Sequence, residues 1–245
     1  MTAQPGLVFG VDPAHYDQHR PAVPELAVEW LLPADSAVVV DVGAGTGHLT
    51  RILLERAAKV IAVDPDEQMC GWLRARFPDA TVHLGSSEHL PVSTASADAV
   101  LTSNAWHWFD PAKAGAEAAR CLKPGGVLGV SWHDRGPSDM WLDEVQDVIF
   151  SAHNPSRPLN KMKLPEDLPF GPVEKHVIGY EREMTPQEIC AMHSTYSAII
   201  SLADDEREAL LDKLYGHFAD RAADRGTPTL GVPFVATLYR TYRLA

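Results

Sequence analysis

The chain has 245 residues, of which 45% are hydrophobic and 22% are charged, and it contains 17 glycines and 19 prolines. This composition is that of an ordinary globular protein and excludes extensive disorder, a collagen and a coiled coil. Lysine and arginine number 21 against 33 aspartates and glutamates, a formal net charge of -12, which argues against a nucleic-acid-binding protein.

No segment of the sequence is typical of a membrane span or an export signal. There is no run of 18 apolar residues, and the N-terminus lacks a basic region followed by an apolar stretch. The cysteines Cys70, Cys121 and Cys190 are widely spaced and odd in number, which predicts free thiols in a reducing compartment. His15 and His19 are four residues apart without an evident third ligand, so no metal site is predicted. We expect a cytoplasmic protein.

Hydrophobic patterning predicts alternating strands and helices as far as residue 132. Helices are predicted at 21–32, 49–58, 67–77 and 113–122, and strands at 37–40, 60–63, 81–84, 97–102 and 127–132. The strands are short, continuous apolar runs, which is typical of strands buried on both faces of a parallel sheet. The alternation predicts an α/β, Rossmann-like, doubly wound sheet.

The pattern changes after residue 132. A helix is predicted at 138–151, a proline-rich stretch without a clear period follows at 153–172, and further elements are a strand at 173–180, helices at 186–194 and 205–224, and a strand at 232–242. We expect a single domain with four parts: an N-terminal arm and helix (1–34), a core (35–132), a cap with the sixth strand (133–230) and a final strand (231–245).

A glycine-rich turn, DVGAGTG at residues 41–47, lies at the first strand-to-helix junction, where open α/β sheets bind ligands. A dinucleotide fingerprint would require glycine where His48 stands, and a pyrophosphate there would meet the like charge of Asp41. A sulfonium nucleoside has no phosphate and carries a cationic amino group, which acidic neighbours favour. Asp64 ends the next strand, where its carboxylate is placed to accept hydrogen bonds from ribose hydroxyls. A nicotinamide or flavin site and a turn without ligand are the alternatives.

DVGAGTG followed by AVDPDEQM at residues 62–69 resembles motifs I and II of the class I S-adenosylmethionine-dependent methyltransferases. Further matches follow in order: GSSEHLP at 85–91, ADAV at 97–100, AWHWFD at 105–110 and LKPGG at 122–126. The sequence is similar to the type 11 small-molecule branch, near the trans-aconitate methyltransferase-like group, which has a tyrosine four residues before Arg-Pro, as at Tyr16 and Arg20. The resemblance implies a seven-stranded sheet with an antiparallel last strand and a C-terminal substrate cap.

The resemblance also implies S-adenosyl-L-methionine as cofactor. The matching positions are Tyr16, Arg20, Gly43, Gly45, Gly47, Asp64, Pro65, Met69, Ser86, Ser87 and Asn104. Asp64 would bind the ribose of the cofactor, and Pro65 and Met69 would flank its adenine. Asn104 would contact the methionine moiety, and Arg20 would pair with the carboxylate of that moiety. Ser86 departs from the aspartate more common in the family, which puts adenine binding there in doubt. The structural alternative for Met69 is packing in the core. For Tyr16 and Arg20 it is a place on the surface of an N-terminal arm.

Aromatic residues and a histidine fill the segment at 105–109, whose aromatic faces are suited to stabilise a methyl sulfonium. We expect His107, at the carboxyl end of a strand, to take a proton from a hydroxyl or amine acceptor, with His133 as the second candidate base. The residues expected to line the substrate side are Trp106, Trp132, His193, Tyr196 and Ser197. The alternative for His107 and His133 is a structural role. For Trp108 and Phe109 the alternative is packing in the core.

The function expected from these features is methyl transfer from S-adenosyl-L-methionine to a small organic acceptor by in-line displacement, with release of S-adenosyl-L-homocysteine. Enzymes that methylate amino groups of nucleic acids carry Asn/Asp-Pro-Pro-aromatic after the fourth strand, whereas NAWH stands here at 104–107. We expect a monomer or homodimer without nucleic-acid or membrane partners. The alternatives are a non-methylating enzyme and a ligand-binding module that use S-adenosylmethionine as a structural or electrostatic cofactor.

Overall fold

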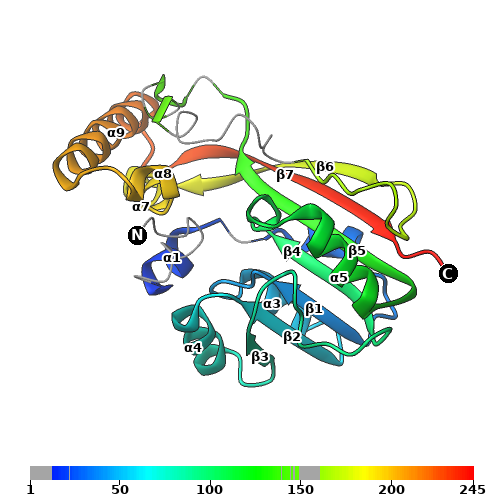
Figure 1. Cartoon of the computed structure of the whole chain (residues 1–245). Helices are drawn as coiled ribbons and strands as arrows, with labels where there is room; N and C mark the ends of the chain where they lie inside the picture. The colour runs from blue at the N-terminus through cyan, green and yellow to red at the C-terminus, as the bar shows by residue number, and fades with distance from the viewer. Residues whose placement is uncertain (1–12, 22, 139, 144, 146, 149–160) are drawn as a thin grey trace.

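A single sheet dominates the computed structural model, which describes residues 13–21, 23–138, 140–143, 145, 147–148 and 161–245. The strands in this part of the chain are β1 (Val38–Val42), β2 (Lys59–Asp64), β3 (Thr81–Leu84), β4 (Ala97–Ser103), β5 (Leu122–Arg135), β6 (Glu174–Met184) and β7 (Leu230–Tyr242). They are arranged in the order β3-β2-β1-β4-β5-β7-β6 (Figure 1).

The direction of the strands confirms the expected topology. Strands β1 to β5 run parallel, whereas β7 runs antiparallel to both of its neighbours, β5 and β6. The chain first builds outward from β1 through β2 to β3 and then restarts on the other side of β1 with β4. The carboxyl ends of β1 and β4 therefore flank the topological switch point, which is where such sheets bind ligands.

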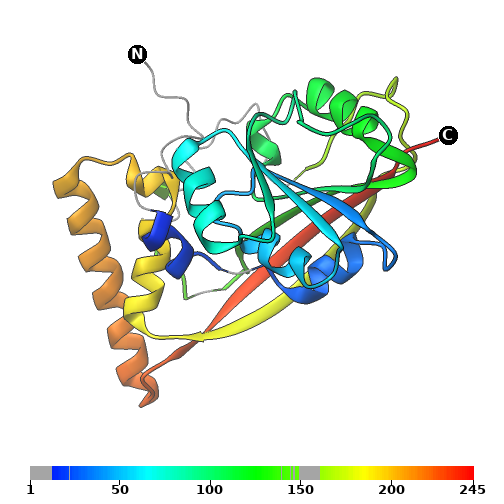
Figure 2. The same cartoon turned by 90° about the horizontal axis from the view of Figure 1, so that it is seen from below.

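Helices pack on both faces of the sheet (Figure 2). The helices next to the sheet are α2 (Glu25–Leu31), α3 (His48–Leu54), α4 (Glu67–Arg76) and α5 (Pro111–Cys121). The buried side chains of α2 and α3 pack with Val39, Val60 and Leu101, whereas those of α5 pack with Val40 and Val100 on the opposite face. This division follows from the alternation of side chains along each strand. Its effect is to bury both faces, as the continuous apolar runs predicted.

A cap of helices lies beyond one end of the sheet, where β6 and β7 extend toward it (Figure 1). It comprises α7 (Pro186–Ser194), α8 (Ser197–Ile200) and α9 (Asp204–Arg225), and it has its own apolar core. Helix α7 begins with a capping box, in which Thr185 and Glu188 satisfy each other's backbone N–H groups. The short helix α1 (Pro13–His19) contacts both α4 and α7, so it links the cap to the first half of the sheet.

Several elements differ from those predicted. Residues 13–19 form a helix although they are too polar to show a clear period. The helix predicted from residue 21 begins only at Glu25, because Pro24 is extended (ψ 137°) and disfavours helix before it. Strand β5 begins at Leu122, directly at the end of α5. The predicted helix at 138–151 falls largely outside the described residues. No helix in the described part of the chain is long and apolar enough to cross a membrane.

Candidate active site

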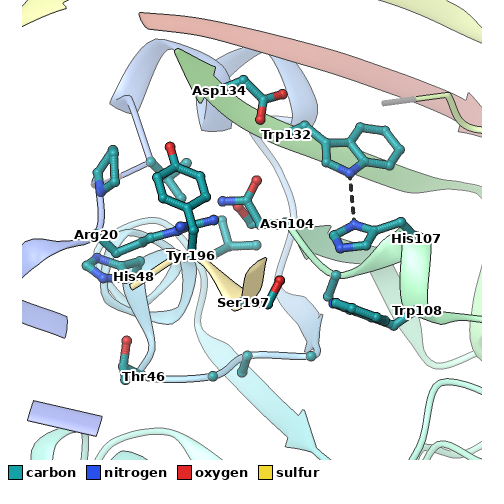
Figure 3. A pocket seen from close by; sticks show the side chains of 18 of the residues that line it. Arg20, Thr46, His48, Asn104, His107, Trp108, Trp132, Asp134, Tyr196 and Ser197 are labelled. Atoms are coloured by element: carbon teal, nitrogen blue, oxygen red, sulfur yellow. Dashed lines mark hydrogen bonds between the residues drawn. The ribbon is translucent and has the colours of Figure 1, made fainter. Parts of the chain in front are cut away.

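A cavity of about 800 Å³, here called the cleft, opens at the carboxyl ends of β1, β4 and β5 and is bounded on one side by α8. The predicted residues that line it are Arg20, Gly43, Gly45, Asp64, Pro65, Met69, Asn104, His107, Trp132, Tyr196 and Ser197. Figure 3 shows Arg20 and Tyr196 on one side of the cleft, with His107 and Trp108 on the other. The cleft therefore brings together residues that the sequence assigned separately to a cofactor and to an acceptor.

The glycine-rich turn presents backbone without side chains to the cleft. Gly43 has a φ of +69°, and a Cβ there would lie 2.6 Å from the Cβ of Ala105, so a side chain is excluded. The Gly43 N–H donates to the Val63 carbonyl at 2.8 Å, which ties the turn to β2. Gly45 has a φ of +55°, and a Cβ there would meet no protein atom within 4 Å. A ligand in the cleft therefore has direct access to the backbone of Gly45.

Asp64 fixes the geometry of this turn from the end of β2. Its Oδ2 accepts the Gly45 N–H at 2.8 Å, and its Oδ1 accepts the Asp66 N–H at 2.9 Å. Burial raises the pKa of Asp64, although these two hydrogen bonds partly oppose the shift. Each carboxylate oxygen has a further lone pair, so Asp64 can accept additional donors from the cleft.

Four buried polar atoms of cleft residues lack a hydrogen-bond partner among the described residues: Asp41 Oδ1, Thr46 Oγ1, His48 Nε2 and Ser103 Oγ. The other oxygen of Asp41 accepts the Thr50 hydroxyl at 2.6 Å. Buried polar atoms are normally paired, so these atoms call for a ligand or for water. A ligand that carries an ammonium group and hydroxyls, as S-adenosylmethionine does, fits this donor and acceptor set.

Asp41 gives a pH-dependent prediction. Burial raises its pKa to about 7, so between about pH 4 and pH 7 the unfolded chain releases a proton that the folded protein retains. Its contribution to the free energy of unfolding is therefore largest at low pH and falls as the pH rises through this window. The stability of wild type relative to Asp41→Asn should fall by about 2–4 kcal/mol from pH 4 to pH 7.5, since one pKa unit corresponds to about 1.4 kcal/mol. Urea unfolding of both proteins at the two pH values measures this difference, and parallel pH profiles would contradict it.

Gly47 lies outside the cleft lining. Its φ is +92°, and a Cβ there would lie 2.4 Å from Phe77 Cε2 and 2.8 Å from Leu73 Cδ2. These two side chains belong to α4 and to its C-terminal end. Gly47 therefore allows close packing of the start of α3 against α4, which is a structural requirement of the turn.

Ser86 and Ser87 also lie outside the cleft lining. Burial would raise the pKa of the neighbouring Glu88, but hydrogen bonds from the Ser86 and Ser87 hydroxyls, together with those from the backbone of Asp110 and Glu88, outweigh that effect and hold the pKa below its usual value. In this structure the two serine hydroxyls therefore donate hydrogen bonds to the Glu88 carboxylate, which also accepts the Asp110 N–H at 3.4 Å. Tyr16 belongs to α1, and its side chain falls outside the described part of the structure.

The two buried histidines do not reach the cleft. His133 Nε2 lies 3.2 Å from Ser131 Oγ, and burial lowers the pKa of His133 to about 3. His193 Nδ1 donates to the Ile189 carbonyl at 2.7 Å, and its Nε2 accepts from Arg135 Nη1 at 3.2 Å. Burial, followed by the charge of Arg135, lowers the pKa of His193 to about 3. Both imidazoles are therefore neutral near pH 7. His193 contacts the cleft residues Arg135, Trp141 and Tyr196 without lining the cleft itself.

Asn104 directs the chain out of β4 toward the cleft. It has a φ of +54°, which asparagine tolerates better than most residues. Its Oδ1 accepts the His133 N–H at 2.9 Å, and its own N–H donates to the Ser131 carbonyl, so it joins the ends of β4 and β5. Trp106 follows in the short 3₁₀ segment but is buried, with its ring edge-on to Phe109 at 5.8 Å, and does not line the cleft.

Two arginines converge on the cap side of the cleft. The Arg20 guanidinium lies 4.4 Å from the centre of the Tyr196 ring, and its Nη1 donates to the Thr195 hydroxyl at 3.4 Å. The Arg135 guanidinium lies 4.9 Å from the centre of the Trp141 ring. Stacking on aromatic rings holds both cations in place.

Several cleft residues were missed by sequence reasoning. They are Thr46, His48, Asp134, Arg135 and Trp141. Thr46 belongs to the glycine-rich turn and His48 follows it, whereas Asp134 and Arg135 end β5. The carboxyl ends of neighbouring strands meet at one edge of the sheet, and this would have indicated all four residues. Nothing in the sequence indicates Trp141.

Comparison with known proteins decides the family. A family profile described as a methyltransferase domain matches residues 40–130. An uncharacterized methyltransferase of Mycobacterium tuberculosis is 38% identical over 234 residues, covering 96% of this chain and 95% of the relative. The chain belongs to the class I S-adenosylmethionine-dependent methyltransferases. The methyl donor of this methyltransferase is therefore S-adenosylmethionine, and the nicotinamide, flavin and ligand-free alternatives are set aside.

Solved structures share the fold of this methyltransferase. A putative type II methyltransferase from Anaeromyxobacter dehalogenans aligns with a TM-score of 0.65 and 24% identity, covering 91% of this chain and 97% of that one. Phosphoethanolamine N-methyltransferase 2 from Haemonchus contortus, solved with phosphomonomethylethanolamine and S-adenosylhomocysteine, aligns with a TM-score of 0.55 and 13% identity, covering 96% of this chain and 58% of that one. At these identities the likeness shows the fold alone.

Proposed function

We propose that this methyltransferase transfers the methyl group of S-adenosylmethionine to a small organic acceptor and releases S-adenosylhomocysteine. The observation that carries the proposal is the continuity of the cleft, which is lined both by the glycine-rich turn and by cap residues such as Trp141, Tyr196 and Ser197. Its volume of about 800 Å³ lies within the range typical of small-molecule sites. The net charge of -12 disfavours a nucleic-acid acceptor.

The cofactor half of the cleft is formed by the first two strand ends. S-adenosylmethionine supplies an electrophilic methyl group when bound. We assign the ribose hydroxyls to the Asp64 carboxylate, the adenine to Pro65 and Met69, and the amino-acid carboxylate to Arg20. Gly45 allows the ligand to approach the backbone, because no side chain intervenes there.

The acceptor half is formed by the ends of β4 and β5 and by the cap. Trp108, Trp132 and Tyr196 give this half aromatic walls that exclude water from the reacting atoms. In a displacement reaction much of the rate acceleration comes from alignment of the reacting atoms, and fixed aromatic walls restrict the orientations of a bound acceptor. The related fold that binds phosphomonomethylethanolamine also supports a small acceptor. The finer similarity to the trans-aconitate methyltransferase-like group stays part of this proposal.

We also propose that the whole chain is one methyltransferase domain. Strands β6 and β7 complete the sheet, while the helices between them supply the cap residues Tyr196 and Ser197. The cap and the sheet therefore contribute to the same cleft.

The test is a methyl-transfer assay that measures S-adenosylhomocysteine release. The acceptor panel contains small carboxylic acids, phenols, thiols and amines, with a transfer RNA and a DNA duplex as comparison substrates. We expect turnover with at least one class of small acceptor and none with the nucleic acids. Binding of S-adenosylmethionine without methylation of any small acceptor would overturn the proposal and favour a ligand-binding module.

A further inference from the structure

A hydrogen bond joins the side chains of Trp132 and His107 on the acceptor side of the cleft. The indole Nε1–H of Trp132 donates to His107 Nδ1 at 3.2 Å (Figure 3). The indole nitrogen is a donor only, so the direction of this hydrogen bond is unambiguous. Nδ1 of His107 is therefore the acceptor and carries no proton while this contact is made.

The indole is held in this orientation by its surroundings. Trp132 is 2% exposed and packs edge-on against Tyr239, with ring centres 5.9 Å apart and planes at 90°. It lies on β5, beside β4 at the pairing of Ser103 with Ser131, so its backbone position is set by the sheet. His107 follows β4, with its ring centre 4.7 Å from that of Trp108. The sheet therefore fixes the backbone of Trp132, and the short 3₁₀ segment after β4 carries His107.

The hydrogen bond determines the tautomer of the imidazole. A neutral imidazole carries one N–H, so with Nδ1 as the acceptor the proton resides on Nε2. A general base needs an available lone pair on nitrogen. In this tautomer Nε2 has no lone pair to offer, and the Nδ1 lone pair is directed at the indole. His107 is therefore arranged as a donor of a hydrogen bond.

We propose that Trp132 fixes His107 in the Nε2–H tautomer, and that His107 donates this hydrogen bond to an oxygen of the methyl acceptor rather than removing its proton. This inference rests on the proposed function for the location of the acceptor. It replaces the base role expected from the sequence with a positioning role. It also indicates the class of acceptor, namely an oxygen-bearing molecule whose nucleophilic atom does not depend on His107 for deprotonation.

The tautomer can be measured without any substrate. Long-range ¹H–¹⁵N correlation spectra of the uniformly ¹⁵N-labelled protein distinguish Nδ1–H from Nε2–H imidazoles, and the His107→Gln spectrum identifies the signals of His107. We expect only the Nε2–H form in the wild type. We expect Trp132→Phe, which removes the indole donor, to show a population of the Nδ1–H form as well.

Trp141→Phe is the matched control. Trp141 is a second indole in the cleft lining, but its Nε1–H donates to the Gly136 carbonyl at 2.8 Å. Its replacement should leave the His107 signals unchanged. A wild-type His107 with Nδ1–H, or a Trp132→Phe spectrum identical to wild type, would overturn the inference.

Methyl transfer gives a second readout, with the acceptor that is turned over fastest in the panel above. Glutamine keeps an N–H donor near the position of Nε2 but is no base, whereas alanine has neither property. The donor role predicts that His107→Gln keeps kcat/KM within about tenfold of wild type and that His107→Ala loses about tenfold more. A base role predicts an equal loss of about 10²–10⁴-fold in both variants. Absence of turnover with every acceptor would contradict the proposed function, while the spectra would still decide the tautomer.

Discussion

Asp64→Ala should bind S-adenosylhomocysteine about 10- to 100-fold more weakly than the wild type. The carboxylate lies at the end of β2, lines the cleft and accepts the Gly45 N–H at 2.8 Å. Its removal deletes the acceptors assigned to the ribose hydroxyls and frees the turn that faces the ligand. Loss of buried hydrogen bonds to a charged group costs about 1.5–3 kcal/mol, and about 1.4 kcal/mol corresponds to tenfold in affinity. Isothermal titration calorimetry measures the change.

Asp66→Ala is the control for this experiment. Asp66 caps α4 by accepting the Gln68 N–H at 2.8 Å and does not line the cleft. Its replacement should cost about 1 kcal/mol of stability and leave the affinity unchanged. Thermal unfolding of both variants shows whether each is folded. Wild-type affinity in Asp64→Ala would remove Asp64 from the binding site.

Gly47→Ala should destabilise the protein by about 2–4 kcal/mol. The alanine Cβ would lie 2.4 Å from Phe77 Cε2, and the backbone would have to keep a φ of +92°. A left-handed conformation costs a residue other than glycine about 1–2 kcal/mol, and overpacking adds about 1–3 kcal/mol. Urea unfolding measures the loss directly.

Gly45→Ala provides a comparison within the same turn. Its φ of +55° carries a similar conformational cost, but its Cβ would meet no protein atom within 4 Å. We therefore expect a loss of only about 1–2 kcal/mol in stability, together with weaker binding of S-adenosylhomocysteine, because the new methyl group enters the cleft. Equal destabilisation by the two substitutions would contradict the distinction between Gly47 as a packing residue and Gly45 as a ligand-facing residue.

The central strands β1, β2, β4 and β5 were predictable from the sequence because they contain apolar runs that are buried on both faces of the sheet. The apolar run predicted as a strand at 37–40 shows this well: β1 forms at 38–42, and four of its five residues are buried. The antiparallel placement of β7 came from the family resemblance, since strand periodicity alone does not specify pairing. Helix α1 was missed because its order depends on contacts with α4 and α7, which are distant in the sequence.

The residues of the site that a local motif specifies were predictable, whereas contacts between residues distant in the sequence were not. Gly43, Gly45 and Asp64 occupy the ends of two adjacent strands, so a local motif was sufficient to indicate them. The pairing of His107 with Trp132 joins residues 25 positions apart in the sequence, and no sequence motif encodes which imidazole nitrogen accepts the hydrogen bond. For His133 the local sequence was misleading. Its expected position after a strand indicated a catalytic base, whereas the structure buries its ring.

The most direct test of this account is a calorimetric titration of the wild-type protein, freed of co-purified ligand, with S-adenosylhomocysteine and, separately, with NADH. The account predicts saturable binding of S-adenosylhomocysteine at one site per chain and no binding of NADH, because the glycine-rich turn lies beside Asp41 and Asp64 rather than a phosphate site. Binding of NADH, or binding of neither ligand by the folded protein, would contradict it.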